Sequence, residues 1–573
     1  MIAAEFAVTL TLEGPIMTQS SSAGAFGLDA VMAQSNGTYY LAGSLIKGLL
    51  HEAWQELASI DPSFLILRDK WLGKASPDAS DDAPNRGLLF FEDLQDQNTD
   101  LNAANTLFRI KMDSERGSDE RGAYQVIESP YKPGQPVSFT GTFRMIAQSD
   151  SEVAEVHKAV LAGLNWIQSA GAERTIGFGR TQSVVCGAPT LLHWQKKPAQ
   201  PNQNRFRLTL EFDRPICMAR RRIAGNYFES EDTIAGAALK GTLAALIDQD
   251  PHSFPLLRQH LWEVAFSHAF PDKEGSRPKR VRESKFRKVV KETFHDALRV
   301  SVAEIEALDE TIEFSVDWKP DKWKPEERPW TWPTVKKELR VRTAIDSKLR
   351  RAADAELFAY EMLVTKGRKW IASATLPYVL GLADEFQMAL QHGLFGIGKT
   401  KACARVLLSP VEKPAVPELK GEIAITLQTP ALICDPERHL APNKETGTSD
   451  QKAMEDEYRA AWAELSGGSL QLQTYFHRCS LAGSEYIRRR FQLKFGHPYT
   501  PYLMTDPGSV FLLKVADATK AKAFLEKALQ NGLPLTPSVK RFYHLDGVPD
   551  SDLWQHCPYL PENGFGEIDL EVL

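Results

Sequence analysis

The 573-residue sequence lacks the features that mark several common protein classes. It contains no run of about 18 apolar residues, so we expect no transmembrane helix and no membrane partner. Its first residues carry no basic stretch and include an early acid, Glu5, so we expect no signal peptide. The six cysteines form no Cys-x-x-Cys pair. This spacing supports neither a zinc knuckle nor a disulfide framework, and it fits a reducing cytoplasm.

Metal-binding histidines and a strong overall charge are also missing. His439, His477 and His497 fall in the last part of the chain without metal-ligand spacing, so we interpret them as ordinary surface or core residues. The net charge of −6 argues against a free nucleic-acid coat protein, but it allows a locally basic groove. With 43% apolar and 25% charged residues, the chain is globular in composition and long enough for two to four domains.

What the sequence does contain is an internal repeat. Residues 42–48 (Ala-Gly-Ser-Leu-Ile-Lys-Gly) resemble residues 235–241 (Ala-Gly-Ala-Ala-Leu-Lys-Gly). Each phrase is followed at a distance by a glycine-rich loop, at 176–181 (Ile-Gly-Phe-Gly-Arg-Thr) and at 396–401 (Gly-Ile-Gly-Lys-Thr-Lys). Two matched pairs in one chain indicate a duplicated binding module.

Hydrophobic periodicity predicts the same pattern of strands and helices around each pair, on an antiparallel sheet. In the first unit we expect strands at 6–12, 137–143 and 182–186, helices at 44–60 (with Ser44 as N-cap) and 152–169, and an exposed insertion at 73–106. In the second unit we expect strands at 206–212 and 404–408, helices at 237–247 and 382–391, and an insertion at about 250–340. A third unit has strands at 421–427 and 508–513 but no Leu-Lys-Gly helix opening.

Two basic segments have more than one interpretation. The run from Arg277 to Lys291, followed by Trp318, Trp323, Trp330 and Trp332, suits single-stranded RNA, because bases stack on aromatic rings. Alternatively, the basic run is a solvated helix face, and the tryptophans hold the insertion on a partner. The run 488–490 (Arg-Arg-Arg), between Tyr486 and Phe491, is equally compatible with an RNA contact and with a protein contact.

Residues 393–400 match the P-loop pattern G-x-x-x-x-G-K-[ST]. A P-loop follows a buried strand and opens a helix whose N-terminus helps to hold the phosphates. Here the order is reversed, since a predicted helix precedes the glycines and a predicted strand follows them. We therefore do not expect nucleotide hydrolysis.

The first unit resembles the RAMP superfamily, in particular the Cas-seven-type backbone subunits of type III CRISPR–Cas effectors. The likeness spans roughly residues 5–190 and rests on 24–29, 42–48 and 175–181. Residues 205–573 are similar to the Cas-five-like cap subunit of type III-D effectors, through 233–241, 355–361 and the loop at Gly396. The zinc-type cysteines usual in that family's insertion are missing here. Alternatively, the second and third units are further backbone modules.

The resemblance implies an α+β fold of tandem ferredoxin-like (RRM-like) RAMP domains with long insertions. It divides the chain into a backbone-type domain at 1–195, a linker at 196–204, and a cap-type domain in two halves, 205–412 and 418–573. The implied partners are CRISPR RNA, target RNA, a large Cas-ten-type subunit, further backbone subunits and a small subunit. The implied role is antiviral defence in the cytoplasm.

A module that grips an RNA backbone needs close main-chain approach and cations rather than base-edge readers. The predicted RNA-binding residues are Gly43, Ser44, Lys47, Gly48, Arg174, Gly177, Gly179 and Arg180 in the first unit, and Arg220, Arg221, Arg222, Gly236, Lys240, Gly241, Gly396, Gly398, Lys399 and Lys401 in the second. The alternative is that Gly48 and Gly241 only permit helix packing, with Lys47 and Lys240 facing solvent.

Asp29 occupies the position of the family's catalytic aspartate, fourteen residues before Gly43. The resemblance implies that it cleaves the paired target RNA with Mg²⁺ or another divalent metal, either as a metal ligand or by orienting a 2′-hydroxyl. The alternative is a local Asx turn and a non-catalytic scaffold. At the same offset before Gly236 stands Arg222, so we expect the second unit to bind RNA without cutting it.

Overall fold

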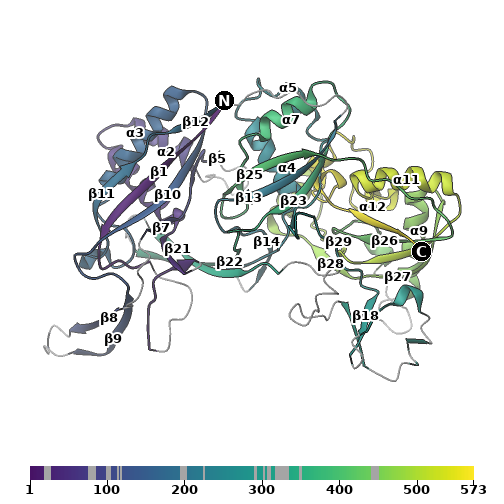
Figure 1. Ribbon diagram of the computed structural model, residues 1–573, viewed down its shortest axis with the longest axis horizontal. Helices are drawn as coiled ribbons and strands as arrows, with labels where there is room; N and C mark the ends of the chain where they lie inside the picture. The colour runs from purple at the N-terminus through teal and green to yellow at the C-terminus, as the bar shows by residue number, and fades with distance from the viewer. Residues whose placement is uncertain are drawn as a thin grey trace.

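The computed structural model describes most of the chain and shows a mixed α+β protein with antiparallel sheets (Figure 1). The described residues are 1–18, 27–35, 37–74, 85–97, 105–112, 115, 119–193, 203–223, 226–289, 293–300, 304–305, 307, 311–315, 334–346, 351–439 and 451–573. Three larger sheets follow one another along the long axis of the molecule. We call the parts built on them the first body (β1 to β12), the second body (β13 to β25) and the third body (β26 to β31).

The first body is built on a sheet with the order β11-β1-β10-β7-β3-β2. Its strands are β1 (Ile2–Glu13), β2 (Gln34–Ser35), β3 (Thr38–Leu41), β6 (Leu89–Phe91), β7 (Leu94–Asp96), β10 (Pro136–Ala147), β11 (Arg180–Cys186) and β12 (Thr190–His193). Alternate residues of β1 are apolar, and Phe6, Val8 and Leu10 enter the core. Helices α1 (Gly43–Leu57) and α3 (Asp150–Trp166) pack together, and Trp54 Nε1 donates to the carbonyl of Ala159 at 2.9 Å. The body also holds α2 (Ser63–Trp71), β4 (Gly73–Lys74), β5 (Asn85–Arg86) and η1 (Arg174–Ile176).

The second body repeats this arrangement on a sheet with the order β16-β23-β13-β25-β24. Its strands are β13 (Arg205–Phe212), β16 (Ala265–Phe266), β17 (Phe270–Pro271), β23 (Trp370–Thr375), β24 (Leu394–Ile397) and β25 (Ala402–Pro410), and its helices are α4 (Gly236–Ile247), α5 (Pro255–His260) and α7 (Leu382–Leu390). In both bodies an opening strand lies between a return strand and a final strand: β1 between β10 and β11, and β13 between β23 and β25. The duplication predicted from the two phrases is therefore visible in the order of the elements.

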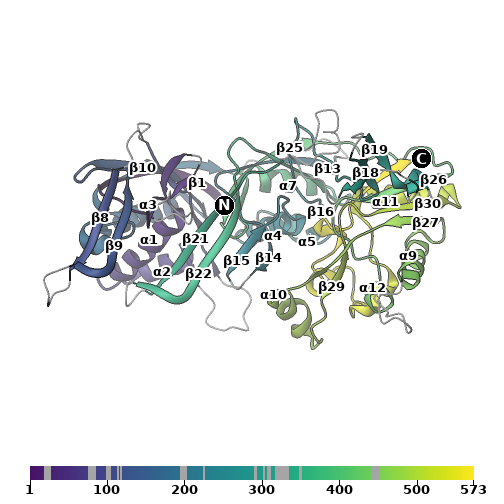
Figure 2. The same cartoon turned by 90° about the horizontal axis from the view of Figure 1, so that it is seen from below.

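A long hairpin precedes the return strand in each body. In the first body it is β8 (Asn105–Met112) with β9 (Asp119–Ser129), which projects away from the molecule in Figure 1. In the second body it is β21 (Lys337–Asp346) with β22 (Arg351–Leu363), joined to β14 (Ala219–Ile223) and β15 (Tyr227–Ser230) in one sheet. Figure 2 shows β21 and β22 reaching from the second body along the first.

The third body has a sheet with the order β27-β30-β26-β31, covered by α9 and α11. Its elements are β26 (Glu422–Leu427), α8 (Pro436–His439), α9 (Gln451–Ser466), β27 (Leu470–Phe476), β28 (Cys479–Ala482), α10 (Glu485–Ile487), η6 (Arg488–Gln492), η7 (Leu493–Phe495), β29 (Tyr502–Thr505), β30 (Val510–Val515), α11 (Ala518–Asn531), α12 (Pro537–Phe542), α13 (Leu553–His556), η8 (Pro561–Asn563) and β31 (Ile568–Val572). As predicted, the strand at 421–427 opens this unit and the strand at 508–513 pairs with it.

Several sequence-based boundaries are wrong. The predicted insertion at 73–106 contains β6 and β7, which are strands of the first sheet, and the one at about 250–340 contains β16 and β17 of the second. Ser44 is not an N-cap, because α1 begins at Gly43 after Ala42 and has no side-chain cap. The four tryptophans at 318–332 and most of the linker at 196–204 lie outside the described residues.

The basic run from Arg277 is not a helix, and its charges are largely neutralised within the protein. It continues into β18 (Lys285–Lys288), which pairs with β19 (Thr293–Asp296) and β20 (Ile312–Phe314). Arg277 pairs with Glu567, Lys279 with Asp569 at 2.6 Å, and Arg282 with both Asp296 and Glu571. The run joins the second body to the last strand of the third, so the structure does not support it as an RNA-contacting patch.

Candidate nucleic-acid interface

A cleft with a volume of about 1800 Å³ lies where the first and second bodies meet, and the third body contributes to its rim. It is lined from the first body by α1, α2 and the segment around β5 to β7, and from the second by α4, β21 and the turn between β24 and β25. Tyr486 and Arg490 of the third body complete the lining. Ligand pockets for small molecules are usually about 300–1,000 Å³. This cleft therefore suits a polymer better than a small molecule.

Cations without a carboxylate partner gather in this cleft. Within the described part of the chain, no carboxylate oxygen lies within 4.0 Å of the charged nitrogens of six lining residues, which we call the cleft cations. They are Lys47, Arg86, Arg342, Lys399, Lys401 and Arg490. The other lining cations are neutralised, since Lys74 lies 3.4 Å from Asp69 and Arg340 lies 2.6 Å from Asp93. The cleft thus keeps an excess of positive charge in a protein whose net charge is −6.

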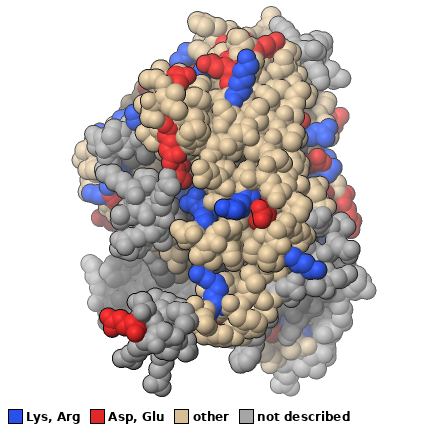
Figure 3. Space-filling model, turned by 90° about the vertical axis from the view of Figure 1, so that its left-hand side faces the viewer, with Lys and Arg blue, Asp and Glu red and all other residues tan. Residues whose placement is uncertain are grey.

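The cleft cations lie close enough to disturb one another. Burial lowers the pKa of Lys401, and the positive charges of Arg86, Lys47 and Lys399 lower it further. Burial also lowers the pKa of Lys47. A bound anion would relieve this repulsion and would raise both pKa values. By contrast, Figure 3 shows only scattered charged side chains among the described residues on the outer end of the first body.

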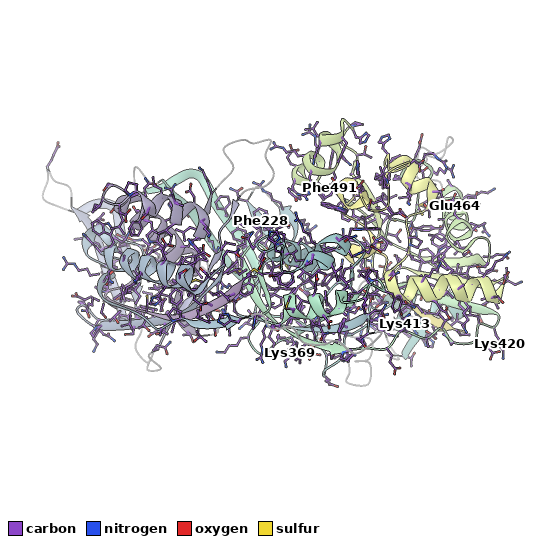
Figure 4. The ribbon with its side chains drawn as sticks, turned by 90° about the horizontal axis from the view of Figure 1, so that it is seen from above. Phe228, Lys369, Lys413, Lys420, Glu464 and Phe491 are labelled. Atoms are coloured by element: carbon purple, nitrogen blue, oxygen red, sulfur yellow. The ribbon has the colours of Figure 1, made fainter. Side chains whose placement is uncertain are left out.

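Aromatic rings, and not carboxylates, support two of the cleft cations. Lys399 Nζ lies 4.8 Å from the centre of the Phe228 ring, and the Arg342 guanidinium lies 5.6 Å from that of Tyr360. The two rings stack, with centroids 5.3 Å apart and planes 13° apart (Phe228 is labelled in Figure 4). Because a π-face attracts a cation without neutralising it, this support holds Lys399 and Arg342 in place with their charge available to a ligand.

The second glycine loop is the tight turn of the β24–β25 hairpin. Gly396 and Gly398 have φ angles of 88° and 68°, in the left-handed region that favours glycine. A Cβ atom on Gly398 would lie 2.7 Å from the carbonyl oxygen of Cys217, so the chain also needs glycine for space. Helix α7 precedes the loop and a strand follows it. The prediction that this segment is no P-loop is confirmed.

The first glycine loop lies elsewhere. Gly177 and Gly179 also have positive φ, at 97° and 61°, and Gly179 packs on the carbonyl of Ala170. None of Arg174, Gly177, Gly179 and Arg180 lines the cleft. Arg180 is exposed, whereas Arg174 lies 4.0 Å from Glu52. The matched sequence phrases therefore do not place the two loops on one surface.

The glycines that open the two repeated helices, Gly43 and Gly236, lie against other protein groups. At α1, the backbone N–H of Gly43 donates to Oδ1 of Asp93 at 2.9 Å, so a protein carboxylate already occupies the helix start. A Cβ atom on Gly43 would lie 2.5 Å from the carbonyl oxygen of Phe91. At α4, a Cβ atom on Gly236 would lie 2.1 Å from the carbonyl oxygen of Phe266 and 2.7 Å from that of Asn563. These two glycines serve packing.

Lys47 and Lys240 are not equivalent either. Lys47 is accessible to solvent on the cleft wall, although the surrounding protein removes enough water from its ammonium to lower its pKa. Lys240 is only 8% exposed, and its ammonium donates to the carbonyl of Trp262 at 2.9 Å. Burial lowers the pKa of Lys240 to about 8. The structure does not support a phosphate contact by Lys240, and the alternative in which it faces solvent is also wrong. Gly48 and Gly241 are open positions, since a Cβ atom on either would meet no atom within 4 Å.

Asp29 lies exposed at the base of the β8–β9 hairpin. Its backbone N–H donates to the carbonyl of Val126 at 2.8 Å, and its Oδ2 accepts from the N–H of Val126 at 2.7 Å. The carboxylate is thus bonded to a distant strand, and this is not the local Asx turn of the alternative interpretation. Residues 19–26, the preceding part of the predicted catalytic loop, lie outside the described residues.

The arginine run of the second unit lies on β14. Arg221 pairs with Glu229, and Arg222 donates to Asn226 Oδ1 at 2.6 Å with its guanidinium 5.7 Å from the centre of the Phe228 ring. Arg220, Arg221 and Arg222 are exposed, but they do not line the cleft. Of the predicted RNA-binding residues, the cleft brings together Gly43, Ser44, Lys47, Gly396, Lys399 and Lys401.

Sequence reasoning missed Arg86, Arg342, Phe228 and Tyr360. Alternation in β21 offers a signal for Arg342, because Arg340 and Arg342 share one face of that strand. Phe228, Tyr360 and Arg340 stand in register on adjacent strands, but pairing of distant segments is not visible in the sequence.

The structure distinguishes between the two interpretations of the run 488–490. Arg488 and Arg489 bind Glu485 of their own helix, whereas Arg490 faces the cleft.

Comparisons with known proteins identify no family for this chain. No protein-family model and no curated protein matches it. Among solved structures, it is similar to a chain of the type III-B Cmr-beta complex bound to cognate target RNA and AMPPnP, with 10% identity and a TM-score of 0.32, over 53% of this chain and 86% of the other. A chain of the complex bound to cognate target RNA gives 10% identity and a TM-score of 0.31, over 58% and 99%. Likeness at this level assigns no role to the chain. In the described part of the chain, no helix is long and apolar enough to cross a membrane.

Proposed function

We propose that this protein is a CRISPR RNA-binding subunit of a type III effector complex in antiviral defence. It grips the 5′ handle and the first guide segment of the RNA. The observation that carries the proposal is the convergence of Lys47 of the first repeated phrase and of Lys399 and Lys401 of the second glycine loop on one cleft, with no carboxylate partner among the described residues. A cleft that binds phosphates without reading base edges suits a guide whose sequence varies.

The proposal includes the fold and the division of the chain. The first body is a backbone-type RAMP domain at 1–195, and the second and third bodies form a cap-type domain at 205–412 and 418–573. The shared element order of the first two bodies supports a tandem ferredoxin-like arrangement. The alternative of three fused backbone modules is less favoured, because the third body has no helix opened by a Leu-Lys-Gly phrase.

The first body is proposed to cleave the paired target RNA at Asp29. Within the described residues, no group of three or more His, Cys, Asp and Glu side chains could hold a metal ion. Mg²⁺, however, often binds through one or two carboxylates and takes its remaining ligands from phosphates and water. Asp29 fits such a site, because it is exposed and, among the described residues, its carboxylate accepts one hydrogen bond, at Oδ2. A divalent ion held there would stabilise charge on the reacting phosphate.

The partners that belong to this proposal are target RNA, a large Cas-ten-type subunit, further backbone subunits and a small subunit, all in the cytoplasm. The competing function is a scaffold that binds RNA without cutting it. The hydrogen bond from Val126 to Asp29 favours this second function, because it gives the carboxylate a structural role that does not involve catalysis.

Sequencing the RNA that copurifies with the chain tests the proposal directly. We expect a uniform population whose 5′ end is a repeat-derived handle. A Lys399→Ala/Lys401→Ala variant purified in the same way should retain clearly less of this RNA. Copurification of random cellular RNA, or of none, would contradict assignment to a CRISPR effector.

A further inference from the structure

The third body presents one exposed aromatic ring and one cation to the cleft. Tyr486 lies in α10, and Arg490 follows four residues later in η6. Both line the cleft. Tyr486 is 51% exposed, although a tyrosine ring in a folded protein gains free energy from burial. The pair is the contribution of the third body to a cleft whose other cations come from the first two bodies.

Arg490 differs from the two preceding arginines in its contacts. Arg488 and Arg489 are both tied to Glu485, at 3.0 and 2.8 Å. Arg490 has no such carboxylate in the described structure, and its guanidinium lies 5.6 Å from the centre of the Phe491 ring. The segment Arg488–Gln492 is a π-helix, a rare local form that often occurs at functional sites.

The cleft walls contributed by the first and second bodies carry Lys47, Lys399 and Lys401, which suit the phosphates of a nucleic acid strand. In Figure 4 the side of the third body is marked by Phe491, the neighbour of Arg490, and that of the second body by Phe228, which supports Lys399. A strand held by its phosphates on the lysine walls leaves its bases free to point away from them. Phe90, Phe91 and Phe395 also line the cleft but are buried or half-buried, so the exposed ring of Tyr486 is the one best placed to accept a base.

We propose that Tyr486 is a stacking subsite for an unpaired base of single-stranded RNA, with Arg490 beside it contacting a phosphate. The inference rests on the proposed RNA-binding function and gives it a substrate class, a single strand with an accessible base. In a duplex, both faces of each internal base are covered by its neighbours, so a duplex offers nothing to this ring.

The test uses the full chain and three variants with fluorescein-labelled single-stranded RNA, and the same RNA annealed to its complement. We expect Tyr486→Ala to weaken single-strand binding at least about fivefold, the lower end of what a lost base stack causes. Tyr486→Phe should bind like the wild type, because it keeps the ring. Tyr378→Ala is the matched control: Tyr378 is 66% exposed and has Lys413 Nζ 4.9 Å from its ring centre, but it lies outside the cleft lining.

A second readout reports stacking itself. Placing 2-aminopurine at successive positions should reveal one whose fluorescence is quenched by the wild type and by Tyr486→Phe, but not by Tyr486→Ala. Unchanged single-strand affinity in Tyr486→Ala, or an equal loss for the duplex, overturns the subsite while leaving the RNA cleft intact. If the wild type itself binds neither RNA, the proposed function fails together with the subsite.

Discussion

Arg340 of β21 forms an ion pair with Asp93 at 2.6 Å, and it is the contact through which the hairpin of the second body reaches the start of α1 in the first. Asp93 also accepts from the N–H of Gly43, and the Arg340 guanidinium lies 4.4 Å from the centre of the Tyr40 ring. Burial raises the pKa of Asp93, but Arg340 and the N–H of Gly43 outweigh it and hold that pKa below its usual value. One carboxylate thus binds both the start of α1 and the hairpin of the second body.

Removing the Arg340 side chain should therefore lower the free energy of unfolding. Arg340→Ala leaves a buried carboxylate without its cation, a change that usually costs about 3–5 kcal/mol. We expect urea denaturation to show this loss at neutral pH. Because the pKa of Asp93 is lowered in the folded state, its contribution is present above its unfolded pKa and disappears as the pH falls through the folded one.

The double variant Arg340→Met/Asp93→Asn supplies the control for that experiment. It removes both charges while keeping an oxygen acceptor for the N–H of Gly43. We expect it to be more stable than Arg340→Ala alone. Equal stability of the two variants would show that the pair does not hold the bodies together.

Asp29→Asn is the sharpest test of cleavage, because asparagine keeps an oxygen that can accept from Val126 and removes only the charge. We expect the assembled complex with this variant to lose one cleavage position on the target RNA and to bind the target normally. Asp29→Ala should show the same cleavage defect together with a less stable β8–β9 hairpin. If Asp29→Asn cleaves at every position like the wild type, the first body is a scaffold.

The cleft cations should set the salt dependence of RNA binding. On single-stranded RNA each phosphate contact contributes about 0.7 to the slope of log K against log salt, so neutralising two phosphate-contacting lysines lowers the magnitude of that slope by roughly 1.4. We expect this change for Lys399→Ala/Lys401→Ala, measured by fluorescence anisotropy over a range of salt concentrations. The control is Lys413→Ala/Lys420→Ala, which removes the same charge from exposed lysines outside the cleft (Figure 4). A parallel loss in both double variants would mean that overall charge, and not the cleft, governs binding.

Lys240 should affect stability and not RNA binding. Since burial lowers its pKa to about 8, the folded state holds fewer protons than the unfolded state between about pH 8 and the usual pKa of lysine near 10.4. The stability of the wild type should therefore gain from this group as the pH rises through that range. Lys240→Met should lack this gain, so its stability relative to the wild type should fall from pH 8 to pH 10. RNA affinity should be unchanged, and a specific loss of affinity with a normal fold would restore the phosphate-contact interpretation.

Much of the secondary structure could be predicted from the sequence because it follows from local periodicity. The helices at 44–60, 152–169 and 237–247 and the strands at 6–12 and 206–212 appear within a few residues of their predicted positions. The turn at Gly396 and Gly398 was also predictable, since its backbone needs glycine. The strands β6, β7, β16 and β17 were missed because they are only two or three residues long and owe their form to pairing with distant strands.

The candidate site could be predicted only in part, because charge in a sequence does not reveal whether a partner lies nearby. The basic run from Arg277 looked like an RNA surface, yet carboxylates of the C-terminal strand neutralise much of it. Lys240 holds the same position in its phrase as Lys47 does in the first, yet its ammonium is buried and donates to the carbonyl of Trp262. Arg342 was not among the predicted contacts, and the sequence left open whether the run containing Arg490 contacts RNA or protein, yet both residues line the cleft.

By itself, the sequence determined that a module occurs twice and that glycine-bearing turns accompany both copies, because periodicity and backbone conformation are local properties. Only the tertiary structure decided which copy of the Lys-Gly phrase lies beside which glycine loop. Lys47 and the loop at Lys399 come together because the second body packs against the first, while the loop at Gly177 lies outside the cleft. Long-range packing brings these cations to one place and neutralises others, and this selection creates the proposed RNA cleft.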